Sequence, residues 1–159
     1  MPEDPLFLSK RLLSEGDKTI AFFQNLDPGQ FDQVVYSEGS KWTVNQVLAH
    51  FVSAEHSLCR LVENIAAGGT GSPEDFDLDD YNERKVKGIK DFAAVELMEA
   101  FRQNRQKTAS FVAGLKSEDL LRQGRHPFLG IAPLSEIIKI IYRHNQIHLR
   151  EIRQELEDR

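Results

Sequence analysis

The sequence has little cysteine and no long apolar stretch. Cys59 is the single cysteine among 159 residues, so no disulfide can form within the chain, and we expect a reducing, cytoplasmic environment. No apolar run approaches the roughly 20 residues that a membrane span requires, and the acidic N-terminus does not resemble an export signal. These absences predict a soluble cytoplasmic protein without a membrane partner.

Glycine and proline are also scarce, with ten and six residues in the chain. A β-sandwich needs such residues in the turns between many short strands, so their scarcity favours helices. Lysine and arginine form no dense run, and the formal net charge is −5. We therefore expect no nucleic-acid partner and look instead for a small-molecule substrate.

Apolar residues recur with helical spacing in four segments, near residues 5–26, from 43 to the glycines at 68 and 69, over 92–115, and over 133–156. Thr43 and Gln46 form a capping-box pattern at the start of the second segment, and the fixed φ of Pro133 suits the first turn of the fourth. Four amphipathic helices of this length predict a single all-α domain over residues 1–159, a four-helix bundle.

The connection between the second and third helices, residues 68–91, is too long for a simple turn. It predicts a crossover that runs along the bundle or covers one end of it. A short extra helix is expected within this crossover, near residues 79–86.

Two histidines interrupt the apolar face of the last helical segment. Its inward positions step by four, three, four and four residues through Ile137, Ile141, His144, His148 and Ile152. Histidines one helical turn apart on one face can place both imidazoles on one ion. Burying unpaired imidazoles is unfavourable, and a divalent metal would satisfy both together. The alternative is a pair of core histidines that hydrogen bond to other side chains.

A third histidine is directed towards the same interior. On a helical wheel of the second segment, His50 lies beside the apolar face that contains Val47, whereas His56 lies on the opposite face, in solvent. His126 precedes a proline and is typical of a turn residue. We therefore predict that His50 joins the two histidines of the last helix in a divalent-metal site. Three protein ligands leave a coordination position open, as in catalytic sites.

Other polar residues are less specific candidates for the site than the three histidines. Glu151 follows His148 by three positions and can be a fourth ligand, an acceptor for a ligand, or a surface carboxylate. Arg105 can receive a substrate anion if it faces inward, although an outward arginine is the simpler interpretation. The run that starts at His144 lacks the glutamate of HExxH zinc proteases, which excludes that class.

Several short motifs occur in an order and at separations typical of one family. They are Trp42-Thr43-Val44, Val47-Leu48-Ala49-His50, Tyr81-Asn82-Glu83-Arg84, His126-Pro127 with Gly130, and His144-Asn145-Gln146-Ile147-His148. Together they resemble the DinB/YfiT-like superfamily from about Trp42 to Ile152. The resemblance implies a four-helix bundle with a long connection between helices two and three, and a metal held by His50, His144 and His148. Asn82 is a further candidate for contact with substrate or with a metal ligand.

The resemblance also implies chemistry and partners. Characterised relatives include S-transferases that use bacillithiol or mycothiol and a mycothiol-dependent maleylpyruvate isomerase, and members are often homodimers. We therefore expect a divalent metal, most simply Zn or Ni with Fe as a third option, and a low-molecular-weight thiol as co-substrate. A metal-dependent hydrolase and a non-enzymatic, stress-related protein with a structural metal are the alternatives.

Overall fold

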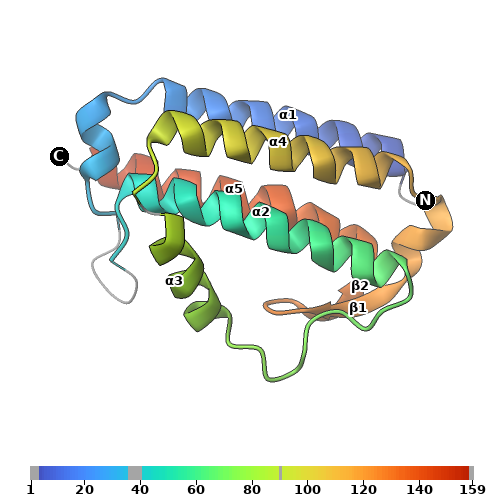
Figure 1. Cartoon of the computed structure of the whole chain (residues 1–159). Helices are drawn as coiled ribbons and strands as arrows, with labels where there is room; N and C mark the ends of the chain where they lie inside the picture. The colour runs from blue at the N-terminus through green and yellow to red at the C-terminus, as the bar shows by residue number, and fades with distance from the viewer. Residues whose placement is uncertain (1–3, 36–40, 90, 158–159) are drawn as a thin grey trace.

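The computed structural model describes residues 4–35, 41–89 and 91–157. Four long helices form a bundle, as predicted (Figure 1). They are α1 (Pro5–Gln24), α2 (Val44–Ala66), α4 (Ala94–Ala113) and α5 (Leu134–Glu157). Helices α2 and α5 form one layer, and α1 and α4 form the other. Each helix packs against its partner in the layer and against one helix of the other layer, α1 against α5 and α2 against α4.

The direction of the helices explains the long crossover. Helices α2 and α4 run the same way along the bundle, and α1 and α5 run the opposite way (Figure 1). The chain must therefore return over the length of the bundle between α2 and α4 before it can start the next parallel helix. Helix α3 (Leu78–Ile89) lies in this return segment and packs against α2. The short helix expected near residues 79–86 is thus confirmed and is longer than predicted.

Local capping fixes where two of the helices begin. The Gln46 backbone N–H donates to Thr43 Oγ1 at 3.2 Å, and the Thr43 N–H donates to Gln46 Oε1 at 2.9 Å, which completes the predicted capping box of α2. At α1, the Asp4 carboxylate accepts from the Leu6 N–H at 3.0 Å, and Pro5 occupies the first helical position. Each cap stabilises its helix by about 1 kcal/mol.

A β-hairpin precedes α5, and the sequence patterns did not indicate it. Strands β1 (Gln123–His126) and β2 (Gly130–Pro133) pair antiparallel. Pro133 therefore ends a strand, and its predicted place in the first helical turn is wrong, because α5 begins one residue later. Gly71 of the crossover forms a bridge with Arg125; its φ is +89°, and a Cβ there would lie 2.4 Å from the Arg125 carbonyl oxygen.

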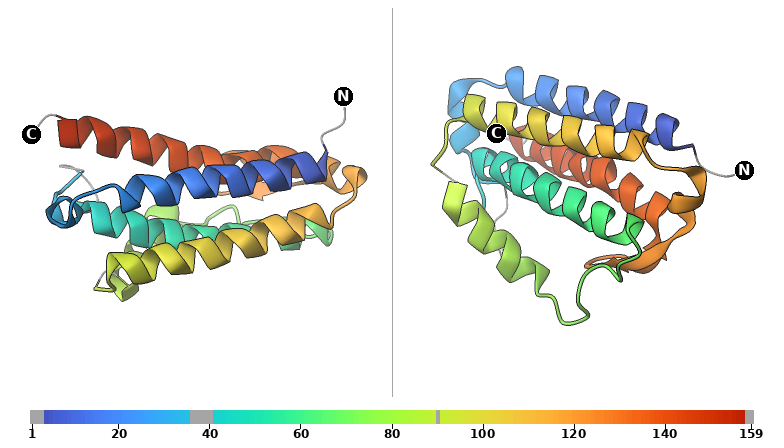
Figure 2. Two further views of the ribbon diagram at one scale, coloured as in Figure 1. Left: turned by 90° about the horizontal axis from the view of Figure 1, so that it is seen from above. Right: turned by 45° about the vertical axis from the view of Figure 1, so that its right-hand side comes forward.

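The hairpin and α3 lie on the same side of the bundle, against the layer of α2 and α5 (Figures 1 and 2). Two 3-10 helices, η1 (Pro28–Asp32) and η2 (Ser117–Leu121), complete the connections. Within the described residues, none of the helices combines the length and the apolar character that a membrane crossing demands.

The apolar core divides into two clusters along the bundle axis. One contains Phe23, Phe51 and Phe101, and the other contains Leu12 and Ile137. Polar side chains are buried between and beside these clusters. They include Glu55, Arg105, Thr108 and Asn145, with His50 beside the first cluster. Buried polar groups in an apolar core require partners, so these residues locate the candidate site.

Candidate metal centre

The three predicted histidines converge inside the bundle. His50 extends from α2, and His144 and His148 extend from successive turns of α5. The Nε2 atom of His144 lies 2.9 Å from Nε2 of His50 and 3.0 Å from Nε2 of His148. One ring nitrogen from each residue lies within 4.8 Å of the others, an arrangement that can hold a metal ion. We call these three residues the histidine cluster.

Aromatic side chains enclose the histidine cluster. The ring of Trp42 packs on His50 with centroids 5.0 Å apart. Phe51 contacts the rings of His144 and His148 at centroid distances of 5.9 and 5.7 Å. His50 is 4% exposed, and the other two rings are half-buried. Aromatic rings thus cover part of the cluster, while its two members from α5 stay partly exposed to solvent.

Burial keeps the cluster uncharged. Desolvation lowers the pKa of His50 to about 3, with a further contribution from the charge of His148. Desolvation also lowers the pKa of His144 well below its ordinary value, and neighbouring cationic groups lower it further. The pKa of His148 is lowered by burial too, against an opposing effect of Glu151. At neutral pH the three imidazoles are therefore neutral, the form that binds metals.

The chemistry of these nitrogens fits a bound cation. A neutral ring nitrogen carries either a proton or a lone pair, so His144 Nε2 can make one well-directed hydrogen bond at most, although two nitrogens lie near it. Two nitrogen ligands of one divalent ion, each at about 2.1 Å, lie roughly 3.0 to 3.4 Å apart. The observed separations are close to this range. A divalent ion that accepts all three lone pairs resolves the conflict.

Glu151 lies behind one of the histidines. Its Oε1 lies 3.3 Å from Nδ1 of His148, the ring nitrogen that faces away from the cluster. Among the roles left open by the sequence, this contact favours an acceptor that orients a ligand. Carboxylates in that position fix the tautomer and the orientation of a metal-binding imidazole. Glu151 is not within the group of converging ligand atoms. Its side chain is 42% exposed, and its role as an acceptor for a ligand stays a prediction.

Arg105 faces inward, and the simpler interpretation of an outward arginine is wrong. The side chain is 2% exposed. Its guanidinium donates to Glu55 Oε1 at 2.8 Å, to the Leu12 carbonyl at 3.0 Å and to Asn145 Oδ1. It therefore links all four bundle helices. We call Arg105, Glu55 and Asn145 the arginine network.

Space for this guanidinium comes from α1. A Cβ at Gly16 would lie 2.9 Å from Cγ of Arg105, so a larger residue at position 16 would displace the arginine. Helical periodicity alone did not reveal this burial, because the partners lie on three other helices. The signal in the sequence was the polar run Asn104-Arg105 within the apolar pattern of α4. Two guanidinium nitrogens donate to protein acceptors, whereas Nε has no hydrogen-bond partner among the described residues. These contacts favour a structural role for Arg105, and the substrate contact predicted for it stays a prediction.

The remaining candidate residues are placed as follows. His56 is exposed on α2, as predicted. His126 is buried and 7% exposed at the end of β1, where its ring closes the hairpin turn. Asn82 is half-buried on α3, next to Tyr81, whose hydroxyl hydrogen bonds to Ser57 of α2. The substrate or ligand contact predicted for Asn82 stays a prediction.

The sequence pattern of one family covers most of the chain. The profile of the DinB superfamily matches residues 11–152. The chain belongs to the DinB superfamily. The resemblance based on short motifs is therefore confirmed, and the family extends beyond the motifs into α1.

Solved structures of other DinB-like and similar proteins share the fold. YfiT from Bacillus subtilis, described as a probable metal-dependent hydrolase with an unusual four-helix bundle topology, is 16% identical with a TM-score of 0.76, over 92% of this chain and 82% of that one. The Sibling Lethal Factor precursor DfsB is 17% identical with a TM-score of 0.75, over 99% and 98%.

The mycothiol-dependent maleylpyruvate isomerase is 15% identical with a TM-score of 0.71. The match covers 93% of this chain and 59% of the isomerase, so this chain spans about three fifths of that enzyme's length. None of the curated proteins compared with the chain matches it. At these identities, the structural likeness establishes the fold alone.

Proposed function

We propose that this DinB protein is a metal-dependent transferase that acts with a low-molecular-weight thiol. The observation that carries the proposal is the set of three imidazole nitrogens that converge without a carboxylate among them. His50, His144 and His148 would hold a divalent ion and leave a position for a small ligand. A bound divalent ion stabilises the thiolate form of a coordinated thiol, and the thiolate is the reactive nucleophile.

The protein residues around the ion would supply orientation and exclude water. Trp42 and Phe51 cover the cluster and lower the local polarity, which strengthens electrostatic interactions within the site. Glu151 would hold the His148 ring through its Nδ1 atom. A thiolate reaction of this kind needs no carboxylate base next to the ion, in agreement with the residues that are present.

The thiol dependence can be tested directly. Protein loaded with Zn or Ni is assayed with several low-molecular-weight thiols and a panel of electrophiles, and His148→Ala serves as the control. The proposal predicts turnover that requires both the thiol and an intact cluster. Turnover in the absence of thiols, combined with no turnover with any of the thiols, would contradict the proposal. The known thiol dependence of a solved structural relative, the mycothiol-dependent isomerase, supports the choice of thiols.

Metal-assisted hydrolysis is the second candidate, and the description of YfiT as a probable hydrolase favours it. In that reaction the open position would hold a water with a lowered pKa. Glu151 is the carboxylate nearest to the cluster in the described contacts, but it faces His148 Nδ1. A hydrolytic activity that falls steeply in Glu151→Ala while metal content is unchanged would favour hydrolysis over thiol transfer.

A non-enzymatic protein with a structural metal is the third candidate. It requires a closed coordination sphere, whereas both enzymatic functions require an open one. Cobalt-substituted protein separates them, because its visible spectrum changes when azide or a thiol enters an open position. A spectrum that neither ligand changes would favour the structural role.

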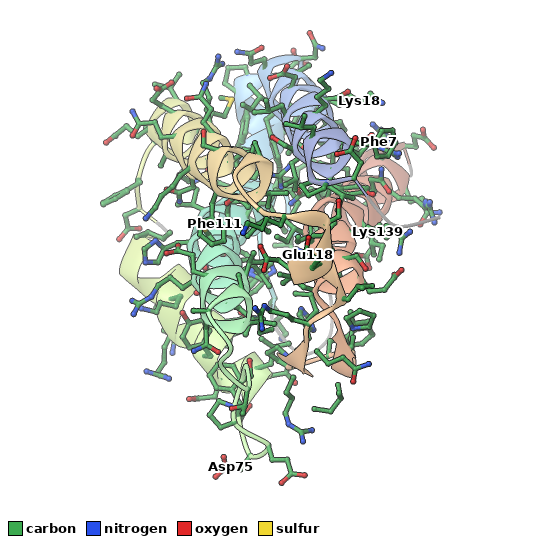
Figure 3. All side chains as sticks on the ribbon, turned by 90° about the vertical axis from the view of Figure 1, so that its right-hand side faces the viewer. Phe7, Lys18, Asp75, Phe111, Glu118 and Lys139 are labelled. Atoms are coloured by element: carbon green, nitrogen blue, oxygen red, sulfur yellow. The ribbon has the colours of Figure 1, made fainter. Side chains whose placement is uncertain are left out.

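We also propose that the protein is a homodimer. Apolar side chains are exposed on the outer faces of α1 and α5, and Phe7 lies at this surface in Figure 3. They are Leu6, Phe7, Leu13 and Ile147, with exposed fractions of 56%, 58%, 41% and 51%. Phe7→Glu is expected to convert a dimer to a monomer in analytical ultracentrifugation. A dimer that persists unchanged in this variant would exclude this surface.

A further inference from the structure

His126 is a buried histidine outside the histidine cluster, and its side chain is directed into the bundle. Neighbouring residues of a strand point to opposite faces. Gly124 shares a face with His126, and a Cβ there would lie 2.4 Å from the Ile65 side chain of α2. Arg125 lies on the opposite face and pairs with Glu74. The face that carries His126 is therefore the face that packs on the bundle.

The hairpin also places His126 near the level of the cluster along the bundle axis. The hairpin folds back along α5, so that its tip and α5 extend in the same direction from Pro133 (Figures 1 and 2). His126 pairs with Gly130, about 10 Å along the strand from Pro133. His144 lies about 15 Å along α5 from Leu134. The two positions therefore differ by about 5 Å along the axis.

Contacts between the elements agree with this placement. Strand β1, which carries His126, packs against α2 and α5, the two helices that supply the cluster. His126 is not one of the converging ligands.

The hairpin turn fixes the tautomer of His126. The backbone N–H groups of Phe128 and Leu129 both donate to its Nδ1, at 3.0 and 3.1 Å. Nδ1 must then present a lone pair, so in the neutral ring the proton lies on Nε2. Nε2 is the far end of the side chain and points away from the turn. The turn thus holds a single N–H donor towards the bundle interior.

We propose that the His126 Nε2–H donates a hydrogen bond to a small anionic ligand, a thiolate or an oxyanion, held at the open position of the metal centre. This inference rests on the proposed metal-dependent function. A donor fixed by the backbone needs no reorientation when negative charge develops on the ligand, which is the arrangement that stabilises such charge most effectively. His126 would then be a ligand-binding residue supplied by the hairpin.

Two substitutions separate the donor from the turn. His126→Asn retains an acceptor for the turn, since asparagine side chains accept from backbone N–H groups two residues ahead, but it lacks the distal donor. His126→Gln retains a distal N–H donor and loses the acceptor at the Nδ1 position. His56→Asn, at an exposed position of α2, is the matched control for loss of a histidine.

Azide binding to the cobalt-substituted proteins is the measurement. All four proteins should bind cobalt with similar affinity. His126→Asn should bind azide at least about tenfold more weakly than the wild type, as expected for the loss of a hydrogen bond to a charged group. His126→Gln should retain more of the affinity, and His56→Asn should match the wild type.

Each other outcome has a defined meaning. Equal azide affinity in the wild type and His126→Asn would overturn the inference. A greater loss in His126→Gln than in His126→Asn would also overturn it, because the turn would then carry the effect. Failure of the wild type to bind cobalt would instead refute the proposed metal function. If His126→Asn does not fold, nitrogen-15 NMR of the wild type decides, since protonation at Nδ1 at neutral pH would overturn the fixed tautomer.

Discussion

The protein buries two polar clusters side by side, and the polar atoms of the two clusters have different kinds of partner. In the arginine network, the Arg105 cation contacts the Glu55 anion, an amide oxygen and a backbone carbonyl. In the histidine cluster, three neutral imidazoles point their nitrogens at one another. Adjacent residues of α5, His144 and Asn145, connect the two.

The contrast distinguishes a structural cluster from a binding site. The arginine network contains both charges, so its cation and anion satisfy each other within the protein, although Glu55 Oε2 and Arg105 Nε have no hydrogen-bond partner in the described part of the chain. The histidine cluster offers several lone pairs and no cation, and it requires a ligand from outside to satisfy them. Where several buried lone pairs converge and no cation lies among them, a binding site for an external cation is indicated.

Breaking the arginine network should produce the largest effect on stability. Arg105→Met leaves Glu55 buried without its partner, and we expect a loss of about 3 to 5 kcal/mol in the free energy of unfolding. Urea denaturation measures it. The double variant with Glu55→Met should recover most of this loss, because the charge that was left unpaired is also removed.

Arg84→Met is the matched control for this substitution. Arg84 pairs with Asp80 where both side chains are exposed, at 67% and 61%, and exposed ion pairs contribute about 0 to 1 kcal/mol. A loss in Arg105→Met no greater than that in Arg84→Met would contradict the structural role of the arginine network.

Metal should stabilise the protein through the histidine cluster alone. At a free metal concentration 1,000 times the Kd, binding to the folded state contributes about 4 kcal/mol. Chelation should therefore lower the Tm of the wild type. His144→Ala, which removes the central ligand, should melt at the same temperature with and without chelator. A chelator effect of equal size in both proteins would place the metal elsewhere.

The free energy of unfolding at acidic pH should depend on His126. Burial lowers its pKa to about 4 in the folded protein, against about 6.5 in the unfolded chain. The unfolded state therefore takes up the proton first, so stability is intact above about pH 6.5 and falls as the pH decreases towards 4.

This contribution amounts to about 3 kcal/mol, and it can be isolated in metal-free protein. The difference in unfolding free energy between the wild type and His126→Asn should change by that amount between pH 7 and pH 4, in favour of the variant at low pH. A difference that does not vary with pH would show that His126 is not buried as described.

The smallest effect is expected from Glu151. Loss of a carboxylate that orients a metal-binding histidine typically weakens metal affinity about tenfold or more. Glu151→Gln should do so, measured by competition with a chromophoric chelator. Glu157→Gln, an exposed glutamate on the same helix, controls for the change of charge. Equal affinities in the two variants would argue that Glu151 does not orient His148.

Much of the fold and of the cluster was predictable, because both depend on periodic patterns within single helices. The capping box at Thr43 and the apolar face of α5 were visible in the sequence, and two histidines on that face stood out at metal-ligand spacing. The position of His50 on its helical wheel then indicated the shared interior.

Features that depend on contacts between distant segments were not predictable. Strands of four residues, such as β1 and β2, carry too little alternation to be distinguished from a loop. The burial of Arg105 depends on Glu55 from α2 and on the space left by Gly16 in α1, which no local pattern encodes. The role of His126 in the turn depends likewise on the hairpin geometry.

Elemental analysis of the purified protein tests the central claim most directly. The wild-type protein and His148→Ala are prepared in parallel, and their divalent-metal content is measured per chain. The account predicts about one ion in each wild-type chain and loss of that ion in the variant, because three imidazoles hold it together. An unchanged metal content in His148→Ala would contradict the assignment of the histidine cluster as the metal centre.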